Sequence, residues 1–355
     1  MRSLPTGTVE DSSSALFPVG RRGPYPGRTG PVGGLRMAQD YSHEPVLVDE
    51  VAALLDAVPA GVVIDGTLGG GGHAATILER RTDVSILGLD RDPEAVAAAA
   101  ASLARFGNRI VIRQARFASM AHELESARAD GSLAQDLEVV GVLLDLGVSS
   151  HQIDDAARGF SYRHEGPLDM RMGNDDGQTA AELLETIDET ALAQLLFENG
   201  ERRFARSIAR SILASKPTST AELSTAVERA VPAAARRHGH VASRTFQALR
   251  IAVNEELEEL AEALDAGLEL LAEHGRLVVV SYHSGEDTLV KSRFRDAATG
   301  GCICPPQLPC VCGAVPTVRL VTRGSQKAGA AEIARNPRSR SARLRSAERL
   351  AGDGQ

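Results

Sequence analysis

The chain has 355 residues, of which 43% are hydrophobic and 24% charged, a composition typical of a folded protein and not of a fibrous or disordered one. Its longest apolar runs, residues 139–144 and 277–280, are too short to cross a bilayer, and we expect no signal peptide. The net charge of −8 argues against unspecific RNA binding, although basic clusters at 201–210, 236–238 and 335–349 would allow a specific contact.

The first 40 residues are rich in Pro, Gly, Ser and Arg and lack a periodic apolar pattern, so we predict that they are disordered. All four cysteines lie between Cys302 and Cys312, which does not suit a disulfide framework in a chain of this length. We therefore expect a reducing, cytoplasmic environment.

From residue 46 onward, apolar segments alternate regularly with turn residues. The expected strands are short, branched apolar runs, at 62–65, 84–89, 109–113 and 137–144. The expected helices lie around and between them, at 48–55, 73–80, 94–105 and 120–129. Four β–α alternations with buried strands predict a parallel sheet that is covered by helices on both faces.

This alternation stops at about residue 150. Residues 150–240 have loop and amphipathic helix patterns, for example at 191–198 and 205–214, and no convincing strand. One long charged helix over 245–273 then leads to a strand at 276–281, and a last strand is expected at 317–322. The prediction is an α/β, doubly wound domain in two parts with an all-helical insertion. Its first part covers 41–150, the inserted substrate-recognition domain 151–240, and the second part, with a cysteine-rich loop, 241–325. A basic C-terminal tail covers 326–355, and the chain after Ala334 is expected to be surface-bound or mobile.

Residues 65–73, DGTLGGGGH, lie between the first strand and the next helix, where glycines let a ligand approach the backbone and the helix offers free N–H groups. The same glycines fit a dinucleotide site, so an NAD-dependent oxidoreductase is an alternative. Asp65 would repel a pyrophosphate and suits a cationic ammonium group, such as that of S-adenosylmethionine. Asp90, at the end of the second strand, can accept hydrogen bonds from ribose hydroxyls. Phe117 either covers an adenine ring or is a core aromatic.

Two further polar residues end strands on the same side of the expected sheet. Asp145 ends the fourth strand, and its carboxylate can accept a hydrogen bond from an exocyclic amine and orient it for attack on a methyl group. Alternatively, Asp145 caps the strand or holds the cofactor. His283 follows the fifth strand and either acts on a proton or contacts the base, or else it is a structural hydrogen-bonding residue. Asp145 and His283 are the candidate catalytic residues.

Six segments carry a resemblance to one family: HEPVL at 43–47, DGTLGGGGH at 65–73, DLGVSSHQ at 145–152, RGFS at 158–161, PLDMRM at 167–172 and NPRSRSARLR at 336–345. In this order they resemble the bacterial methyltransferases that make N4-methylcytidine in the decoding region of 16S ribosomal RNA. The family pattern after the fifth strand is SFHSLED, and Tyr282 and Gly285 depart from it here.

The resemblance implies a Rossmann-like S-adenosylmethionine-dependent methyltransferase core with an inserted helical domain, acting on 16S ribosomal RNA within the small ribosomal subunit. The cofactor-binding residues that it implies are Gly71, Gly72, His73, Asp90, Phe117, Asp145 and Gln152. Members of the family can pair as homodimers. The alternatives are a methyltransferase for another RNA and a non-catalytic ribosome-assembly factor on the same fold.

The cysteines form two C-x-C pairs around a Pro-Pro bend: Cys302, Cys304, Cys310 and Cys312. Four thiolates would suit a structural zinc ion, although C-x-x-C is the more common spacing, and the alternative is a surface loop of thiols without metal. In the tail, Arg338, Arg340 and Arg343 are expected to contact RNA phosphates, or else to bond neighbouring carboxylates from a packed helix.

Overall fold

The structure is a computed structural model, and it describes residues 45–173, 177–236, 241–305, 307 and 311–352. All of these residues belong to one unit, Asp40–Gln355. The segment predicted to be disordered, 1–40, lies outside the described residues, and so does Cys310. Across the described ranges, none of the helices has the length and apolarity to span a membrane.

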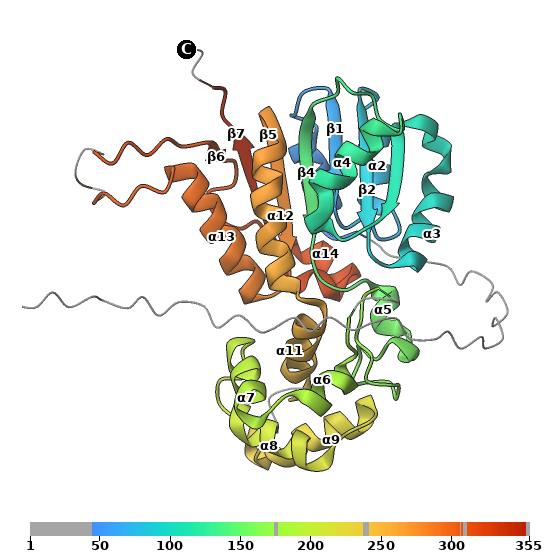
Figure 1. Ribbon diagram of the computed structural model, residues 1–355, viewed down its shortest axis with the longest axis vertical. Helices are drawn as coiled ribbons and strands as arrows, with labels where there is room; N and C mark the ends of the chain where they lie inside the picture. Colours follow the sequence, from blue (N-terminus) through green and yellow to red (C-terminus); the bar gives the residue numbers. More distant parts are fainter. Residues whose placement is uncertain (1–44, 174–176, 237–240, 306, 308–310, 353–355) are drawn as a thin grey trace, which may run out of the picture. The chain divides into compact units, whose positions relative to one another are not determined.

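A central sheet has the strand order β3-β2-β1-β4-β5-β7-β6 (Figure 1). Its strands are β1 (Gly61–Asp65), β2 (Val84–Asp90), β3 (Ile110–Gln114), β4 (Val139–Asp145), β5 (Leu271–Ser281), β6 (Val318–Leu320) and β7 (Arg343–Arg349). β1 to β5 pair in parallel, whereas β7 is antiparallel to both β5 and β6. The chain order reverses between β1 and β4, the kind of switch point where open α/β sheets bind ligands.

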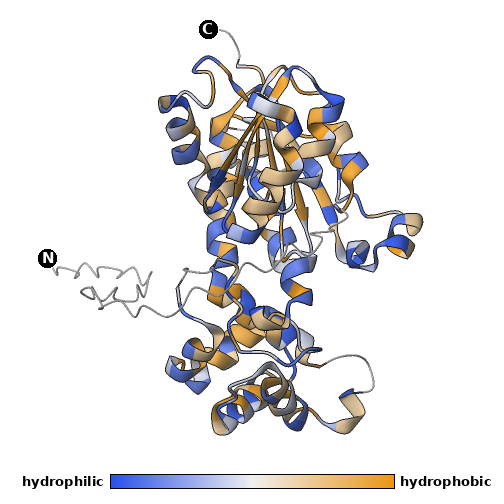
Figure 2. Cartoon of the chain, turned by 90° about the vertical axis from the view of Figure 1, so that its right-hand side faces the viewer, coloured by the Kyte–Doolittle hydropathy of each residue, from blue (hydrophilic) through white to orange (hydrophobic). Residues whose placement is uncertain are grey.

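Helices cover both faces of this sheet. They are α1 (Val48–Leu55), α2 (Gly72–Arg80), α3 (Pro93–Leu103), α4 (Met120–Ala129), α12 (Glu256–Leu270), α13 (Ser284–Thr299) and α14 (Ala330–Arg335). Ile64 and Val142 pack with α4, α12 and α13, whereas their neighbours Val63 and Leu143 pack with α1, α2 and α3. Because successive strand residues point to opposite faces, this packing confirms the predicted doubly wound α/β fold. Figure 2 shows apolar residues concentrated along the strands.

Between β4 and α12 the described chain forms helices and loops and no strand. The α-helices are α5 (Ser150–Asp154), α6 (Ala180–Thr186), α7 (Glu189–Glu198), α8 (Ala205–Ser215), α9 (Thr220–Ala230), α10 (Ala233–Arg236) and α11 (Ala242–Asn254). Buried residues from α6 to α11 form a hydrophobic cluster of their own. Phe246 and Leu249 of α11 belong to this cluster, so the helical insert extends past residue 240, where the sequence boundary was set.

The single helix predicted over 245–273 is wrong. α11 ends at Asn254 and α12 begins at Glu256, because Glu255 between them has a left-handed backbone conformation with φ 52°. Residues 271–275 already belong to β5. Neither Gly nor Pro marks the break, which tertiary hydrogen bonds of Asn254 stabilise instead, as described below.

The prediction of a mobile or surface-bound tail is also wrong for residues 343–349. They form β7, which lies between β5 and β6, with Leu344 and Ala347 buried. Arg343 and Arg345 alternate with Leu344 and Ser346 in the period of two that a strand requires. The arginine content hid this strand pattern.

Candidate active site

A cavity of about 590 Å³ lies at the carboxyl ends of the parallel strands. Each strand end contributes to its lining: Gly66 follows β1, Asp90 ends β2, Asp145 ends β4 and Tyr282 follows β5. The strand order that reverses between β1 and β4 therefore gathers residues far apart in the sequence at one site.

Segments outside the parallel strands also line this cavity. Met172 and Arg250 come from the helical insert, and Arg338 and Arg340 come from the segment between α14 and β7. Arg340 is exposed, and Arg338 pairs with Asp154 of α5 at 2.8 Å. The segment before β7 therefore adds two arginines to the cavity lining, one of them paired with a carboxylate of α5.

The glycine turn shapes the β1 side of the cavity. Gly69 and Gly71 have φ values of 53° and 84°, a left-handed region that favours glycine. A Cβ on Gly72 would lie 2.6 Å from the side chain of Pro45, so close packing also requires glycine there. Gly72 lines the cavity at the start of α2, whereas Gly71 is buried behind it and contributes through the shape of the turn.

Asp90 ties the glycine turn to the end of β2. One carboxylate oxygen accepts a hydrogen bond from the backbone N–H of Gly69 at 2.8 Å, and the other from that of Asp92 at 2.9 Å. Burial raises the pKa of Asp90 to about 6, although these two backbone donors lower it. A carboxylate in this state is a good acceptor for hydroxyl groups of a ligand.

Asp65 is the acid that the sequence analysis placed opposite a cationic ligand. The structure puts it behind Gly66 and Thr67, which line the cavity while Asp65 itself does not. It is 1% exposed; its Oδ1 accepts a hydrogen bond from the N–H of Thr67 at 3.2 Å, and its Oδ2 has no hydrogen-bond partner. Burial raises the pKa of Asp65 to about 7. Direct contact with a ligand is therefore not supported by its position.

Asp145 is held from three sides. Its backbone N–H donates to the hydroxyl of Thr67 at 2.6 Å, and its Oδ1 accepts a hydrogen bond from the hydroxyl of Tyr282 at 2.8 Å. Nε2 of His73 lies 3.3 Å from Oδ2, within ion-pair distance. Burial lowers the pKa of His73, but the hydrogen bond and charge of Asp145 outweigh burial and raise it. The sequence analysis missed Tyr282 in this group.

His283, the second candidate catalytic residue, does not line the cavity. It is the N-cap of α13 and forms a capping box with Glu286. Its Nε2 lies 3.1 Å from Oε1 of Glu286, a buried carboxylate. Burial raises the pKa of Glu286, but the hydrogen bond and charge of His283 bring it below its usual value. The position of His283 therefore corresponds to the structural alternative.

Phe117 and Gln152 both line the cavity. Phe117 begins a short 3₁₀ helix, η2 (Phe117–Ser119), in the loop that follows β3. The side-chain amide of Gln152 donates to Asp92 at 2.8 Å, and its oxygen accepts from the N–H of Ser149 at 3.0 Å. Both ends of this amide are thus bonded within the protein. Gln152 therefore fixes the start of α5 and forms part of the cavity wall.

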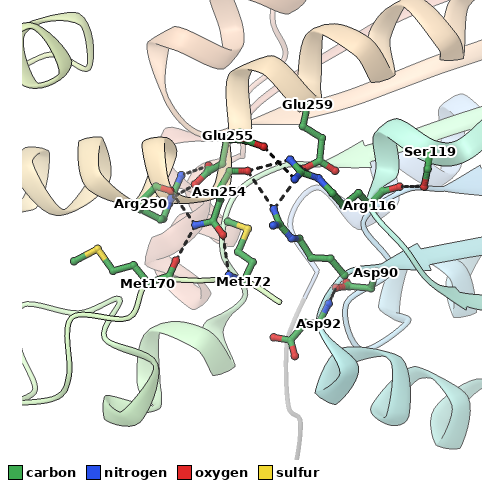
Figure 3. Close-up of polar contacts among 12 residues, drawn as sticks. Asp90, Asp92, Arg116, Ser119, Met170, Met172, Arg250, Asn254, Glu255 and Glu259 are labelled. Carbon is green, nitrogen blue, oxygen red and sulfur yellow. Dashed lines mark hydrogen bonds and ion pairs between the residues drawn. The ribbon is translucent and has the colours of Figure 1, made fainter. Parts of the chain in front are cut away.

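A buried ion-pair network joins the sheet to the α11–α12 break (Figure 3). Glu259 of α12, whose side chain is 1% exposed, lies 3.0 Å from Arg116 and 3.4 Å from Arg91. The backbone carbonyl of Asn254 accepts a hydrogen bond of 3.3 Å from each of the same two arginines. The end of α11 is thereby bonded to the residues that follow β2 and β3.

The side chain of Asn254 extends this network into the insert. Its oxygen accepts from the N–H of Met172 at 2.8 Å, and its nitrogen donates to the carbonyl of Met170 at 2.7 Å and to that of Arg250 at 2.9 Å. Arg250 also forms two hydrogen bonds of 2.7 Å with Glu256 across the helix break. These contacts give the insert a fixed connection to the cavity wall.

The residues of the cavity fit a nucleoside cofactor with a charged amino-acid end. Asp90 supplies acceptors, the glycine turn supplies backbone close to the start of a helix, and Phe117 supplies an aromatic surface. Nε2 of His73 contacts Asp145, whereas its Nδ1 is buried without a hydrogen-bond partner among the described residues, so this residue of the cavity lining keeps one polar atom that a ligand could bond.

The chain is similar to known proteins along most of its length. A model of the MraW methylase family matches residues 40–350. Ribosomal RNA small subunit methyltransferase H of Anaeromyxobacter dehalogenans is 49% identical over 320 residues, covering 88% of this chain and 100% of that protein. The protein of that name from Geotalea uraniireducens is 46% identical over 318 residues, covering 88% and 99%. A solved rRNA methylase from Streptococcus thermophilus has 9% identity and a TM-score of 0.39, covering 87% of this chain and 98% of that one.

Proposed function

This chain belongs to the MraW methylase family, and from that premise we propose that it transfers a methyl group from S-adenosylmethionine to the N4 amine of a cytidine in the decoding region of 16S ribosomal RNA. The names of its relatives support ribosomal RNA as the substrate. The observation that carries the proposal is the carboxylate of Asp145, which Tyr282 and His73 hold at the edge of the cavity.

The cofactor would supply an electrophilic methyl group. The residues proposed to hold it come from the glycine turn, the strand ends and two flanking side chains: Gly71, Gly72, His73, Asp90, Phe117, Asp145 and Gln152. Asp90 would accept hydrogen bonds from ribose hydroxyls, and Phe117 would cover the adenine ring. Gly71 and Gln152 would act by shaping the cavity, because Gly71 does not line it and the amide of Gln152 is bonded within the protein.

Asp145 would act on the amine that receives the methyl group. The exocyclic nitrogen of cytosine is a weak nucleophile because its lone pair is delocalised into the ring. A carboxylate that accepts a hydrogen bond from this nitrogen orients it and stabilises the positive charge that develops during attack. Each carboxylate oxygen can accept more than one hydrogen bond, so the contacts of Asp145 with Tyr282 and His73 leave it able to do this.

The RNA would approach over the arginines of the cavity lining. Arg338, Arg340 and, from the insert, Met172 all line the same cavity, which suits phosphate contacts by the arginines and substrate recognition by the helical domain. A ribosomal substrate would place the activity in the bacterial cytoplasm, on the small subunit. Self-association stays a prediction of the family resemblance.

The test is methyl transfer from labelled S-adenosylmethionine to unmodified small ribosomal subunits, followed by nucleoside analysis. We expect N4-methylcytidine from the wild type, and a rate lower by about 100-fold or more for Asp145→Ala, as for loss of an electrostatic catalytic group. Asp136→Ala, which removes an exposed carboxylate outside the cavity lining, is the matched control and should keep full activity. Cofactor binding without label in subunits or in naked 16S RNA would reject this substrate and favour another RNA.

A further inference from the structure

Three of the four cysteines converge in the segment between α13 and β6. The Sγ atoms of Cys302, Cys304 and Cys312 all lie within 4.8 Å of one another, and those of Cys302 and Cys312 are 3.6 Å apart. A disulfide would bring two sulfurs to about 2.05 Å. In a tetrahedral zinc site with Zn–S bonds of about 2.3 Å, by contrast, neighbouring sulfurs are about 3.8 Å apart.

Where the structure describes this loop, its large apolar side chains are exposed to solvent. Ile303 and Val311 are each 89% exposed and Val315 is 73% exposed. At its base, a Cβ on Gly300 would lie 2.5 Å from the backbone of Val315, and the N–H of Thr317 bonds the carbonyl of Ala297 at 2.9 Å. The base is therefore closed by backbone contacts. Beyond it no described hydrophobic cluster includes the loop, and small units without a core commonly depend on a metal or disulfides.

We propose that Cys302, Cys304 and Cys312 bind a zinc ion as thiolates and that this ion fixes the loop between α13 and β6. Thiolates favour zinc over magnesium or calcium, and a water molecule or another group would complete the tetrahedron. None of the three cysteines lines the cavity at the strand ends, so the metal has a structural role and takes no part in methyl transfer.

A second group of potential ligands in the described residues does not support a metal in the same way. Glu256, His283 and Glu286 also come within 4.8 Å of one another. Arg250, however, forms two hydrogen bonds with Glu256, and His283 lies at ion-pair distance from Glu286. The positive charge that these carboxylates need is thus supplied by the protein itself, so this group does not require a metal ion.

The test is the zinc content of the full chain, expressed without a histidine tag and purified under reducing conditions, measured by elemental analysis and native mass spectrometry. We expect close to one zinc per chain in the wild type and a loss of about tenfold or more in Cys302→Ser/Cys304→Ser/Cys312→Ser, because zinc affinity falls steeply with each ligand removed. The matched control is Ile303→Ser/Val311→Ser, which places serines in the same loop and should retain the metal.

Two further readouts make the result decisive. Replacement of zinc by Co²⁺ should give the ligand-field absorption of a tetrahedral thiolate site in the wild type and in the control, and none in the triple variant. A chelator should speed proteolytic cleavage of the loop in the wild type, while methyl transfer stays unchanged. A wild-type chain that is purified without zinc and takes up neither Zn²⁺ nor Co²⁺ under reducing conditions would overturn the proposal, and so would a triple variant that retains the metal.

Discussion

The hydroxyl of Tyr282 donates a hydrogen bond of 2.8 Å to Oδ1 of Asp145, and so joins the residue after β5 to the last residue of β4. Burial and the negative charge of Asp145 raise the pKa of Tyr282 well above its usual value, so the phenol stays protonated and remains a donor. With His73 3.3 Å from Oδ2, the carboxylate is oriented from both sides. A fixed orientation is what an acceptor for a substrate amine requires.

Tyr282→Phe places the residue of the family pattern at this position; because Asp145 of this chain is oriented by the phenol, the variant should lower kcat here and leave the affinity for S-adenosylmethionine nearly unchanged. Loss of a hydrogen bond to a charged group costs about 1.5–3 kcal/mol, so we expect kcat to fall about 10- to 100-fold. The measurement is steady-state methylation of small subunits together with calorimetric titration of the cofactor. Tyr162→Phe, in a ring that packs on Phe246 in the insert, is the matched control. An unchanged kcat in Tyr282→Phe would show that Asp145 does not need this donor.

Asp65 should make the stability of the fold depend on pH. Burial raises its pKa in the folded state from 3.8 to about 7. The folded chain therefore holds a proton that the unfolded chain has lost, so this residue's contribution to the free energy of unfolding is largest below about pH 4 and is lost as pH rises through 7.

Asp65→Asn should remove this pH dependence. From pH 5 to pH 8, the free energy of unfolding of the variant should rise by about 1–3 kcal/mol relative to that of the wild type. The wild type must ionise a buried carboxyl group over this range and the variant does not, whereas burial of an amide N–H lowers the stability of the variant equally at both pH values. Urea unfolding at the two pH values, without cofactor, measures the difference. The exposed Asp136→Asn should follow the wild type. If the curves of Asp65→Asn and wild type stay parallel with pH, Asp65 does not carry the raised pKa.

The first part of the fold could be predicted from the sequence because its signals are local. The helix α3, for example, begins with Asp92 as N-cap and Pro93 in its first turn, and β4 is a branched apolar run that ends at Asp145. The break at Glu255 gives no such signal. It depends on hydrogen bonds of Asn254 to Met170 and Met172, which are distant in the sequence.

The site could be predicted in part for a similar reason. Parallel strands bring their carboxyl ends together, so Asp90 and Asp145 were expected at one edge of the sheet, and the structure brings them into one cavity. The hydroxyl of Tyr282 acts on Asp145 across two neighbouring strands, a distance that no sequence spacing gives. The available signal was its position directly after a strand. His283 has the same signal but points to Glu286, because it caps a helix.

Asn254→Ala should destabilise the connection between the insert and the core. Asn254 is 1% exposed, and its loss would leave the N–H of Met172 and the carbonyl of Met170 without their partner. We expect the free energy of unfolding to fall by about 2–4 kcal/mol, the cost of two buried unsatisfied groups. Chemical denaturation measures it. Asn199→Ala, which removes a side-chain bond only to the carbonyl of Leu195 in its own helix, should cost far less. Equal losses in both variants would contradict a special role of Asn254.

Arg338 and Arg340 should contribute to RNA binding through phosphates. Both line the cavity and Arg340 is exposed, whereas Arg343, which the sequence analysis grouped with them, bonds Ser325 and lies in β7. Arg338→Ala/Arg340→Ala should weaken binding to 16S RNA and reduce the slope of log K against log salt by about 1–2, because each phosphate contact contributes about 0.7–0.9.

The matched control is Arg80→Ala/Arg105→Ala, which changes the net charge equally at residues that do not line the cavity. The two double variants differ only in where positive charge is lost, so a comparison across a salt series separates a local phosphate contact from a general charge effect. If both slopes fall equally, the arginines beside the cavity act only through net charge. If neither slope changes, the RNA approaches another face, and the insert alone must supply its phosphate contacts.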